Sequence, residues 1–247
     1  MRKDQEMAFP DHLSGSGEST ALSPVRGLRA MRSARAAVLL LHGGRAEALE
    51  PPSMLNLPAL RMRPFAASIR RAVAHEDVFV GHVHYLHRGW NGGNAHPVAD
   101  TRRALSELYE AVGPVPVVLV GHSMGARAAL RAADDPQVRG VVALAPWCPP
   151  RERAPHLGGR TVVALHDEAD RITRAGDTWD YLSRARAAGA EVHGIRMPDG
   201  GHTMIRHARR WQRVATEATT ALLGLTPLPA PLGEAGPWGG RPTLWRP

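Results

Sequence analysis

The sequence has a single cysteine, Cys148, and therefore cannot form a disulfide bond within the chain. This usage is typical of a reducing compartment and predicts a cytoplasmic protein. No run of about 18 uncharged apolar residues occurs, so no membrane span is expected. Residues 1–20 carry charges at both ends without an apolar core between them, which argues against a secretory signal.

Lysine and aromatic residues are also scarce. Lys3 is the only lysine among 31 basic residues, and the arginines are spread along the chain rather than clustered. The net charge of +8 is therefore interpreted as a composition bias of a GC-rich genome rather than as a nucleic-acid surface. Aromatic residues make up only 5%, which disfavours base stacking. Phosphate-loop and dinucleotide fingerprints are missing, so we expect no cofactor and no nucleic-acid partner.

The remaining sequence alternates between two hydrophobic patterns. Short apolar runs typical of buried strands cover residues 37–42, 78–84, 117–120, 141–145, 161–166 and 192–197. Stretches with helical spacing cover residues 64–75, 98–111, 124–133, 174–188 and 205–222. This alternation predicts the α/β class, with a mostly parallel sheet of about six strands and helices on both faces.

The ends of the chain differ from this pattern. Residues 1–35 lack periodicity and are predicted to form a mobile N-terminal arm, within which residues 20–30 are a candidate for an additional strand. Residues 226–247 are dense in proline and glycine, which predicts a disordered tail. A single domain over residues 36–225 remains between them.

The stretch "LVGHSMGAR" at residues 119–127 places Ser123 between Gly121 and Gly125. It can be a turn of small residues or a nucleophile on a strained bend. A strand is predicted before the serine and a helix after it, and this context favours the nucleophile. The N–H of Met124 would then lie at a helix N-terminus, where it can stabilise an oxyanion.

A serine nucleophile needs a base, and the base needs an acid that orients it. "VVALHDEADRIT" ends one predicted strand and offers Asp167, Glu168 and Asp170 as acids. "RMPDGGHTM" ends the last predicted strand and offers Asp199 as an acid and His202 as the base. Because ligand sites of parallel sheets lie beyond the carboxyl ends of the strands, these groups are expected to meet there.

The segments "LLLHGG", "GHSMG", "LHDEADRIT" and "DGGHTM" together resemble the α/β-hydrolase superfamily over residues 36–222. The resemblance implies a catalytic triad of Ser123, Asp170 and His202. Asp170 is favoured over Asp167, which stands where the family commonly has glycine. The resemblance also implies that Gly44 supplies the second oxyanion N–H. His42, which precedes the two glycines, is expected to be a structural hydrogen-bonding residue.

Many members of that superfamily carry a helical lid after the strand that ends here at residue 145. The following segment is too short for one, so no lid domain is expected, and residues 45–62 are the candidate for a partial roof. Trp147 is expected near the site, either as a substrate-binding platform or as a packed loop aromatic. The segments look most like lidless dienelactone-hydrolase or esterase-type members.

The leading hypothesis is a serine hydrolase that cleaves small-molecule carboxylic esters through an acyl-enzyme. Thioesters and lactones use the same chemistry and remain open, as does a binding or scaffold protein with little turnover. His82 and His84 lack the further ligands that a metal site needs, so no metal is expected. The sequence leaves the oligomeric state and the physiological substrate open.

Overall fold

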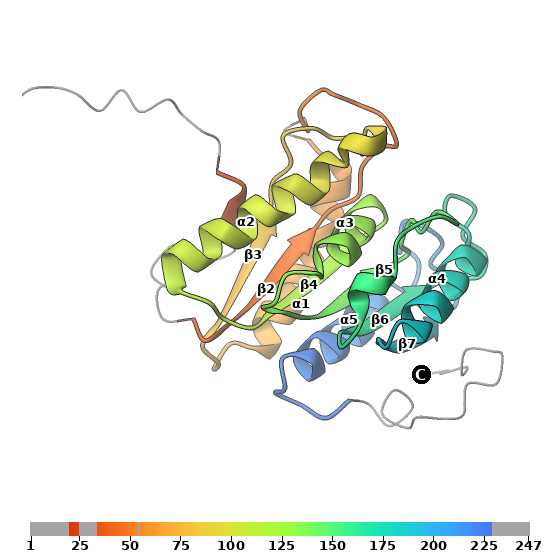
Figure 1. Ribbon diagram of the computed structural model, residues 1–247. Helices are drawn as coiled ribbons and strands as arrows, with labels where there is room; N and C mark the ends of the chain where they lie inside the picture. The colour runs from red at the N-terminus through yellow and green to blue at the C-terminus, as the bar shows by residue number, and fades with distance from the viewer. Residues whose placement is uncertain (1–19, 25–33, 54, 229–247) are drawn as a thin grey trace, which may run out of the picture.

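A seven-stranded sheet forms the centre of the molecule (Figure 1). The computed structural model describes residues 20–24, 34–53 and 55–228. The strands are β1 (Leu22–Pro24), β2 (Ala36–Leu41), β3 (Val78–Val83), β4 (Val117–His122), β5 (Val138–Leu144), β6 (Thr161–His166) and β7 (Glu191–Arg196). Their order is β1-β3-β2-β4-β5-β6-β7, and all neighbouring pairs are parallel except β1 and β3.

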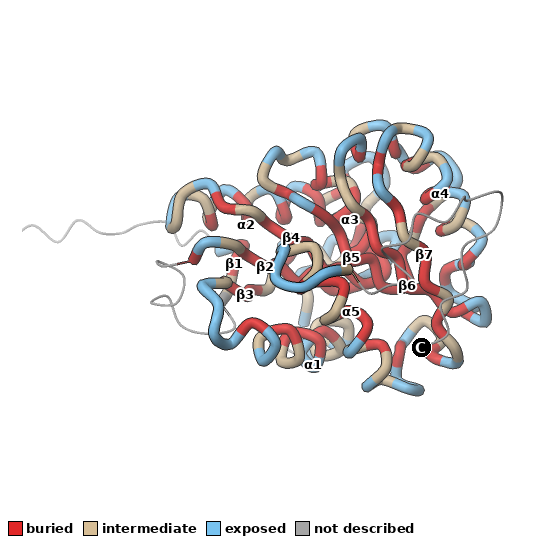
Figure 2. Tube along the Cα trace, turned by 90° about the horizontal axis from the view of Figure 1, so that it is seen from below, coloured by how far each residue is buried: buried red, intermediate tan, exposed pale blue. Residues whose placement is uncertain are grey.

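Among the described residues, five α-helices cover the two faces of the sheet. They are α1 (Leu57–Ala72), α2 (His96–Val112), α3 (Met124–Ala132), α4 (Ala175–Ala187) and α5 (Ala208–Leu222). Helices α1 and α5 pack together on one face, and α2, α3 and α4 cover the other (Figures 1 and 2). The predicted α/β class, with a largely parallel sheet between helices, is confirmed.

The central strands are buried on both faces, which explains their continuous apolar runs. All six residues of β4 are buried, and so are the last five of both β2 and β6. Their side chains alternate between two core clusters, one on each side of the sheet. Figure 2 shows this buried layer between the two helical layers. The core therefore fixes the carboxyl ends of β4, β6 and β7 at one edge.

Two helix boundaries differ from the prediction. Helix α1 was expected to begin at Pro64, but it begins at Leu57, with a second proline in its first turn and Pro64 inside it. Helix α5 begins at Ala208 rather than at residue 205 because His207 has a φ of 54°, and Ile205 lies before it with 71% of its surface exposed. The expected start of this helix at residue 205 was therefore wrong.

Strand β1 lies within residues 20–30, where an additional strand was considered. It pairs antiparallel with β3, and the backbone N–H groups of Ala21 and Leu22 donate to the carboxylate of Glu107 in α2. The rest of the predicted arm, residues 1–19 and 25–33, and residues 229–247 of the predicted tail lie outside the described residues.

The connection from β5 to β6 contains only a short 3-10 helix, η3 (Pro155–Leu157), and no α-helix within its described residues 145–160. The expected lack of a helical lid at this point is therefore confirmed. In the part of the chain that the structure describes, no helix is both long and apolar enough to span a membrane.

Candidate active site

Ser123 lies on a sharp turn between β4 and α3. Its backbone has φ 54° and ψ −117°, a conformation that non-glycine residues rarely adopt. The N–H of Ser123 donates to the carbonyl of Leu144 at 3.0 Å, and its carbonyl accepts from the N–H groups of Arg127 and Trp147. These bonds hold the strained turn in place, and strain of this kind makes Ser123 a candidate functional residue.

The two glycines that flank the turn leave no room for a side chain. A Cβ on Gly121 would lie 2.5 Å from the carbonyl oxygen of Gly125. A Cβ on Gly125 would lie 2.4 Å from the carbonyl oxygen of His42 at the end of β2. Backbone atoms cannot yield at such distances, so both positions require glycine, and α3 packs directly against the sheet.

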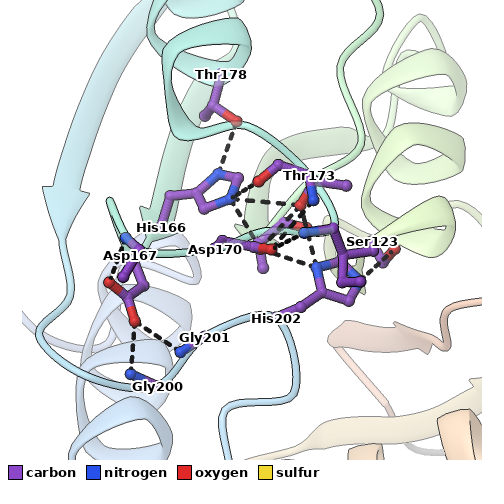
Figure 3. A network of polar contacts seen from close by, with 12 residues as sticks. Ser123, His166, Asp167, Asp170, Thr173, Thr178, Gly200, Gly201 and His202 are labelled. Atoms are coloured by element: carbon purple, nitrogen blue, oxygen red, sulfur yellow. Dashed lines mark hydrogen bonds and ion pairs between the residues drawn. The ribbon is translucent and has the colours of Figure 1, made fainter.

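The three predicted residues form one hydrogen-bonded chain (Figure 3). Nε2 of His202 lies 2.9 Å from Oγ of Ser123, and Nδ1 of His202 lies 2.8 Å from Oδ2 of Asp170. Because a carboxylate only accepts, Nδ1 carries the hydrogen and Nε2 is left free to accept the serine proton. Ser123 is buried, with 8% of its surface exposed.

Asp170 is held in its charged form. Burial alone would raise its pKa, but hydrogen bonds from His166, His202 and the N–H groups of Ile172 and Thr173 outweigh burial and hold the pKa well below its usual range. A carboxylate with this many donors stays ionised through the neutral range and beyond it.

Two residues around Asp170 were not among the predicted site residues. His166, at the end of β6, is fully buried, and its Nε2 lies 3.1 Å from Oδ2 of Asp170 and 3.2 Å from the carbonyl oxygen of Thr173. Nε2 therefore carries the hydrogen, and Nδ1 accepts from the hydroxyl of Thr178 at 2.8 Å. The hydroxyl of Thr173 donates to Oδ2 of Asp170 at 2.9 Å. The sequence signal that could have pointed to His166 is its position four residues before Asp170.

Asp167, the alternative acid, lies away from the imidazole of His202. Its Oδ2 accepts from the N–H groups of Gly200 and Gly201 at 2.7 and 2.6 Å, and its Oδ1 accepts from Ala169 (Figure 3). The carboxylate thus fixes the backbone immediately before His202. In the structure, therefore, Asp170 and not Asp167 lies within hydrogen-bonding distance of His202.

His122, next to Ser123, contacts the loop that carries His202. Its Nε2 donates to the carbonyl of His202 at 2.8 Å, and the two rings lie 4.9 Å apart. Burial, and then the nearby His202, lower the pKa of His122 to about 3. The ring is therefore neutral at working pH and links the elbow to the loop without adding charge.

The loop after β2 borders the serine, as the two glycines predicted. A Cβ on Gly43 would lie 3.4 Å from Cβ of Ser123, and a Cβ on Gly44 would lie 2.3 Å from Cε of Met124. Among the described residues, no protein group accepts from the N–H of Gly44 or of Met124. Both donors are thus available to a ligand, and Met124 begins α3, where the helix dipole favours an anion.

His42 has the surroundings of a structural residue. Its Nδ1 lies 2.7 Å from the carbonyl oxygen of Gly43, and its ring lies 4.5 Å from that of Tyr85. Burial lowers its pKa to about 4. The ring is neutral and supports the loop that carries Gly44.

Trp147 lies beside the elbow and is half-buried. The guanidinium of Arg127 lies between two indoles, 4.4 Å from the ring centre of Trp147 and 3.8 Å from that of Trp90. Arg127 and Arg131 both pair with the buried carboxylate of Glu152. One face of Trp147 is therefore occupied by protein.

The model of the alpha/beta hydrolase family matches residues 38–245. A search of curated protein sequences finds no significant match. Among the described residues, no group of three or more histidine, cysteine or acidic side chains could hold a metal ion.

Solved structures with the same fold include three serine hydrolases or esterases. An alpha-beta serine hydrolase homologue from Coxiella burnetii has a TM-score of 0.58 at 12% identity and covers 80% of this chain and 89% of its own. A serine hydrolase without a lid from Xanthomonas campestris has a TM-score of 0.55 at 19% identity, and the match covers 76% of this chain and 81% of that one. The thermostable carboxylesterase EstE1 from a metagenomic library has a TM-score of 0.58 at 15% identity, and the match covers 79% of this chain and 82% of that one. At these identities the likeness shows the fold.

Proposed function

The chain belongs to the alpha/beta hydrolase family, and from that membership we propose that it is a serine hydrolase that cleaves carboxylic esters through an acyl-enzyme. The observation that carries the proposal is the unbroken chain from Oγ of Ser123 through the imidazole of His202 to Asp170, with distances of 2.9 and 2.8 Å. A hydroxyl in this arrangement loses its proton to the imidazole as it attacks.

The reaction begins when Oγ of Ser123 attacks the carbonyl carbon and its proton passes to Nε2 of His202. Asp170, which stays ionised, stabilises the imidazolium that forms and keeps Nδ1 protonated. When the tetrahedral intermediate collapses, the proton goes to the leaving alcohol and an acyl-serine remains. Water then attacks the acyl carbon, His202 takes its proton, and the acid leaves as Ser123 regains its hydrogen.

Two backbone donors are proposed to bind the oxyanion. The N–H groups of Gly44 and Met124 have no protein acceptor among the described residues, and they flank the serine from two separate elements. Preorganised donors of this kind each contribute roughly 10²–10³-fold to the rate in acyl transfer.

Trp147 is proposed to contact the substrate only through the part of its ring that Arg127 leaves uncovered. Its backbone N–H, at 3.2 Å from the carbonyl oxygen of Ser123, also supports the elbow. The substrate class is proposed by analogy with esterases of the same fold, such as EstE1. Thioesters and lactones are cleaved by the same steps and belong in the same assay.

The test is labelling by a fluorophosphonate together with turnover of 4-nitrophenyl esters. We expect the wild type to be labelled and Ser123→Ala to be unlabelled and slower by several powers of ten. Ser106→Ala, an exposed serine of α2, is the matched control and should behave as wild type. An inert wild type would favour the scaffold alternative, and a Ser123→Ala variant with normal turnover would refute the assignment.

A further inference from the structure

A cavity of about 350 Å³ opens beside the loop that carries Gly44. Its size is at the lower end of the range of about 300–1,000 Å³ that is typical of small-molecule sites. It lies between the loop after β2, the start of α1 and the loop after β3. The lining residues used below are Gly43, Gly44, Arg45, Leu55, Leu57 and Arg88.

Part of the wall is apolar and open to solvent. Leu55 and Leu57 are 80% and 68% exposed, and Pro52 and Pro58 line the same cavity. Large apolar side chains that remain this exposed around a hollow are typical of ligand-binding surfaces. This wall fits a short hydrocarbon stem.

The same cavity has two arginines and no carboxylate among its lining residues. The carboxylate closest to Arg88 is that of Glu50, 3.7 Å from its Nε and 69% exposed, which is too far for a hydrogen bond. Nε of Arg88 is buried without a hydrogen-bond partner in the described structure. The side chain of Arg45 has no ion pair among the described residues. Several other arginines among the described residues also have a buried donor without an acceptor, but Arg88 is the one that lines this cavity, where a ligand group can accept from it.

A second basic cavity shows that this arrangement is not general. It has a volume of about 280 Å³ and is lined by Arg102 and Arg131. Arg102 pairs with Asp134, and Arg131 pairs with Glu152. Their charges are thus neutralised by close carboxylates, whereas Arg45 has no ion pair among the described residues and Arg88 has only the exposed Glu50 at 3.7 Å.

We propose that the cavity beside Gly44 binds a carboxylate of the substrate, which a short apolar stem joins to the scissile ester. This inference rests on the proposed function. Gly44 both lines the cavity and donates the proposed oxyanion N–H, so this shared residue joins the proposed carboxylate site to the reacting carbonyl. The substrates are then half-esters of dicarboxylic acids, or esters of alcohols that carry a carboxylate.

The test compares esters that differ only in charge. For the acyl side, the pair is 4-nitrophenyl hexanoate and the mono-4-nitrophenyl ester of adipic acid, both with six acyl carbons. For the alcohol side, the pair is the acetates of 4-methylphenol and of 4-hydroxybenzoate. The quantity is the ratio of kcat/KM for the anionic ester to kcat/KM for the neutral one, corrected for leaving-group reactivity by the rate in buffer.

We expect the wild type to favour the anionic member of at least one pair about tenfold, the factor typical of one hydrogen bond to a charged group. Arg88→Gln should remove most of this preference, and Arg45→Glu should reverse it because the exposed side chain changes sign. Arg171→Glu, on the loop after Asp170 and outside the cavity, is the matched control and should keep the wild-type ratio. The preference should also weaken in 1 M salt.

The outcomes separate this inference from the proposed function. If no ester is cleaved in a way that depends on Ser123, the proposed function fails. If turnover depends on Ser123 but neither pair shows a charge preference, the inference is wrong and the proposed function stands. The inference is also wrong if Arg45→Glu and Arg171→Glu change the ratio of kcat/KM values equally. Equal changes would report only the net charge around the active site.

Discussion

Asp167 offers a sharp test of how the base is positioned. Its carboxylate accepts the N–H groups of Gly200 and Gly201, and the next residue is His202. The segment has little other regular structure, since φ is positive at Asp199, Gly201 and Met204. We therefore predict that Asp167→Ala releases this segment and moves the imidazole away from Ser123.

The size of the effect follows from the two bonds that are lost. A buried backbone N–H left without an acceptor costs about 1–3 kcal/mol. Asp167 is 4% exposed and Gly200 is buried, whereas Gly201 is partly exposed, so we estimate about 2–4 kcal/mol for the pair. That corresponds to roughly 30-fold to 900-fold in the population of the anchored loop. Asp167→Asn keeps one acceptor oxygen and should lose less.

The assay is steady-state ester hydrolysis together with thermal unfolding. We expect kcat to fall about 30-fold or more in Asp167→Ala, in line with the loss of anchored loop, with KM nearly unchanged because Asp167 does not line the cavity beside Gly44. Glu168→Gln is the control, since this neighbouring acid is exposed and pairs with Arg196 instead. If Asp167→Ala keeps kcat within about twofold of wild type while folded, the positioning argument is refuted.

Two further predictions concern buried histidines. His166→Phe removes a donor 3.1 Å from Asp170. It should lower the free energy of unfolding, measured in urea, by about 1–3 kcal/mol and should lower kcat for ester hydrolysis about tenfold. If both values stay unchanged, the role of His166 is contradicted. The pKa values of His42 and His122 are lowered to about 4 and about 3, whereas the unfolded chain binds these protons near pH 6.5. Stability is therefore complete above pH 6.5 and is lost as the pH falls towards 4, by roughly 1–2 kcal/mol per histidine at pH 5. Urea unfolding at pH 7 and pH 5 checks this, and His122→Asn should have a shallower pH dependence.

Much of the fold could be predicted because the signals are local. Continuous apolar runs indicate strands that are buried on both faces, and β6 has the predicted bounds, residues 161–166. The elbow is equally local, since Gly121 and Gly125 are required by backbone atoms a few residues away or on the adjacent strand. Asp170 and His202 could be proposed from the sequence because each lies in the loop after a strand whose end is fixed by the sheet.

The remaining features depend on contacts between distant segments. Nothing near Asp167 in the sequence indicates that its carboxylate binds Gly200 and Gly201, 33 and 34 residues away. The early start of α1 was missed because Pro64 was interpreted as a helix start, while tertiary packing keeps this proline inside the helix. The cavity beside Gly44 is formed by two loops and the start of α1, which come together only in the folded chain, and no local sequence pattern indicates this.

The short β5–β6 connection has a consequence for what happens after the first half of the reaction. An enzyme with a hinged cover can shield its acyl group and pass it to a chosen acceptor. Residues 145–160 contain no α-helix that could serve as such a cover. We therefore predict that water outcompetes dilute alcohols and amines as the second nucleophile, which would bias this scaffold towards hydrolysis over acyl transfer.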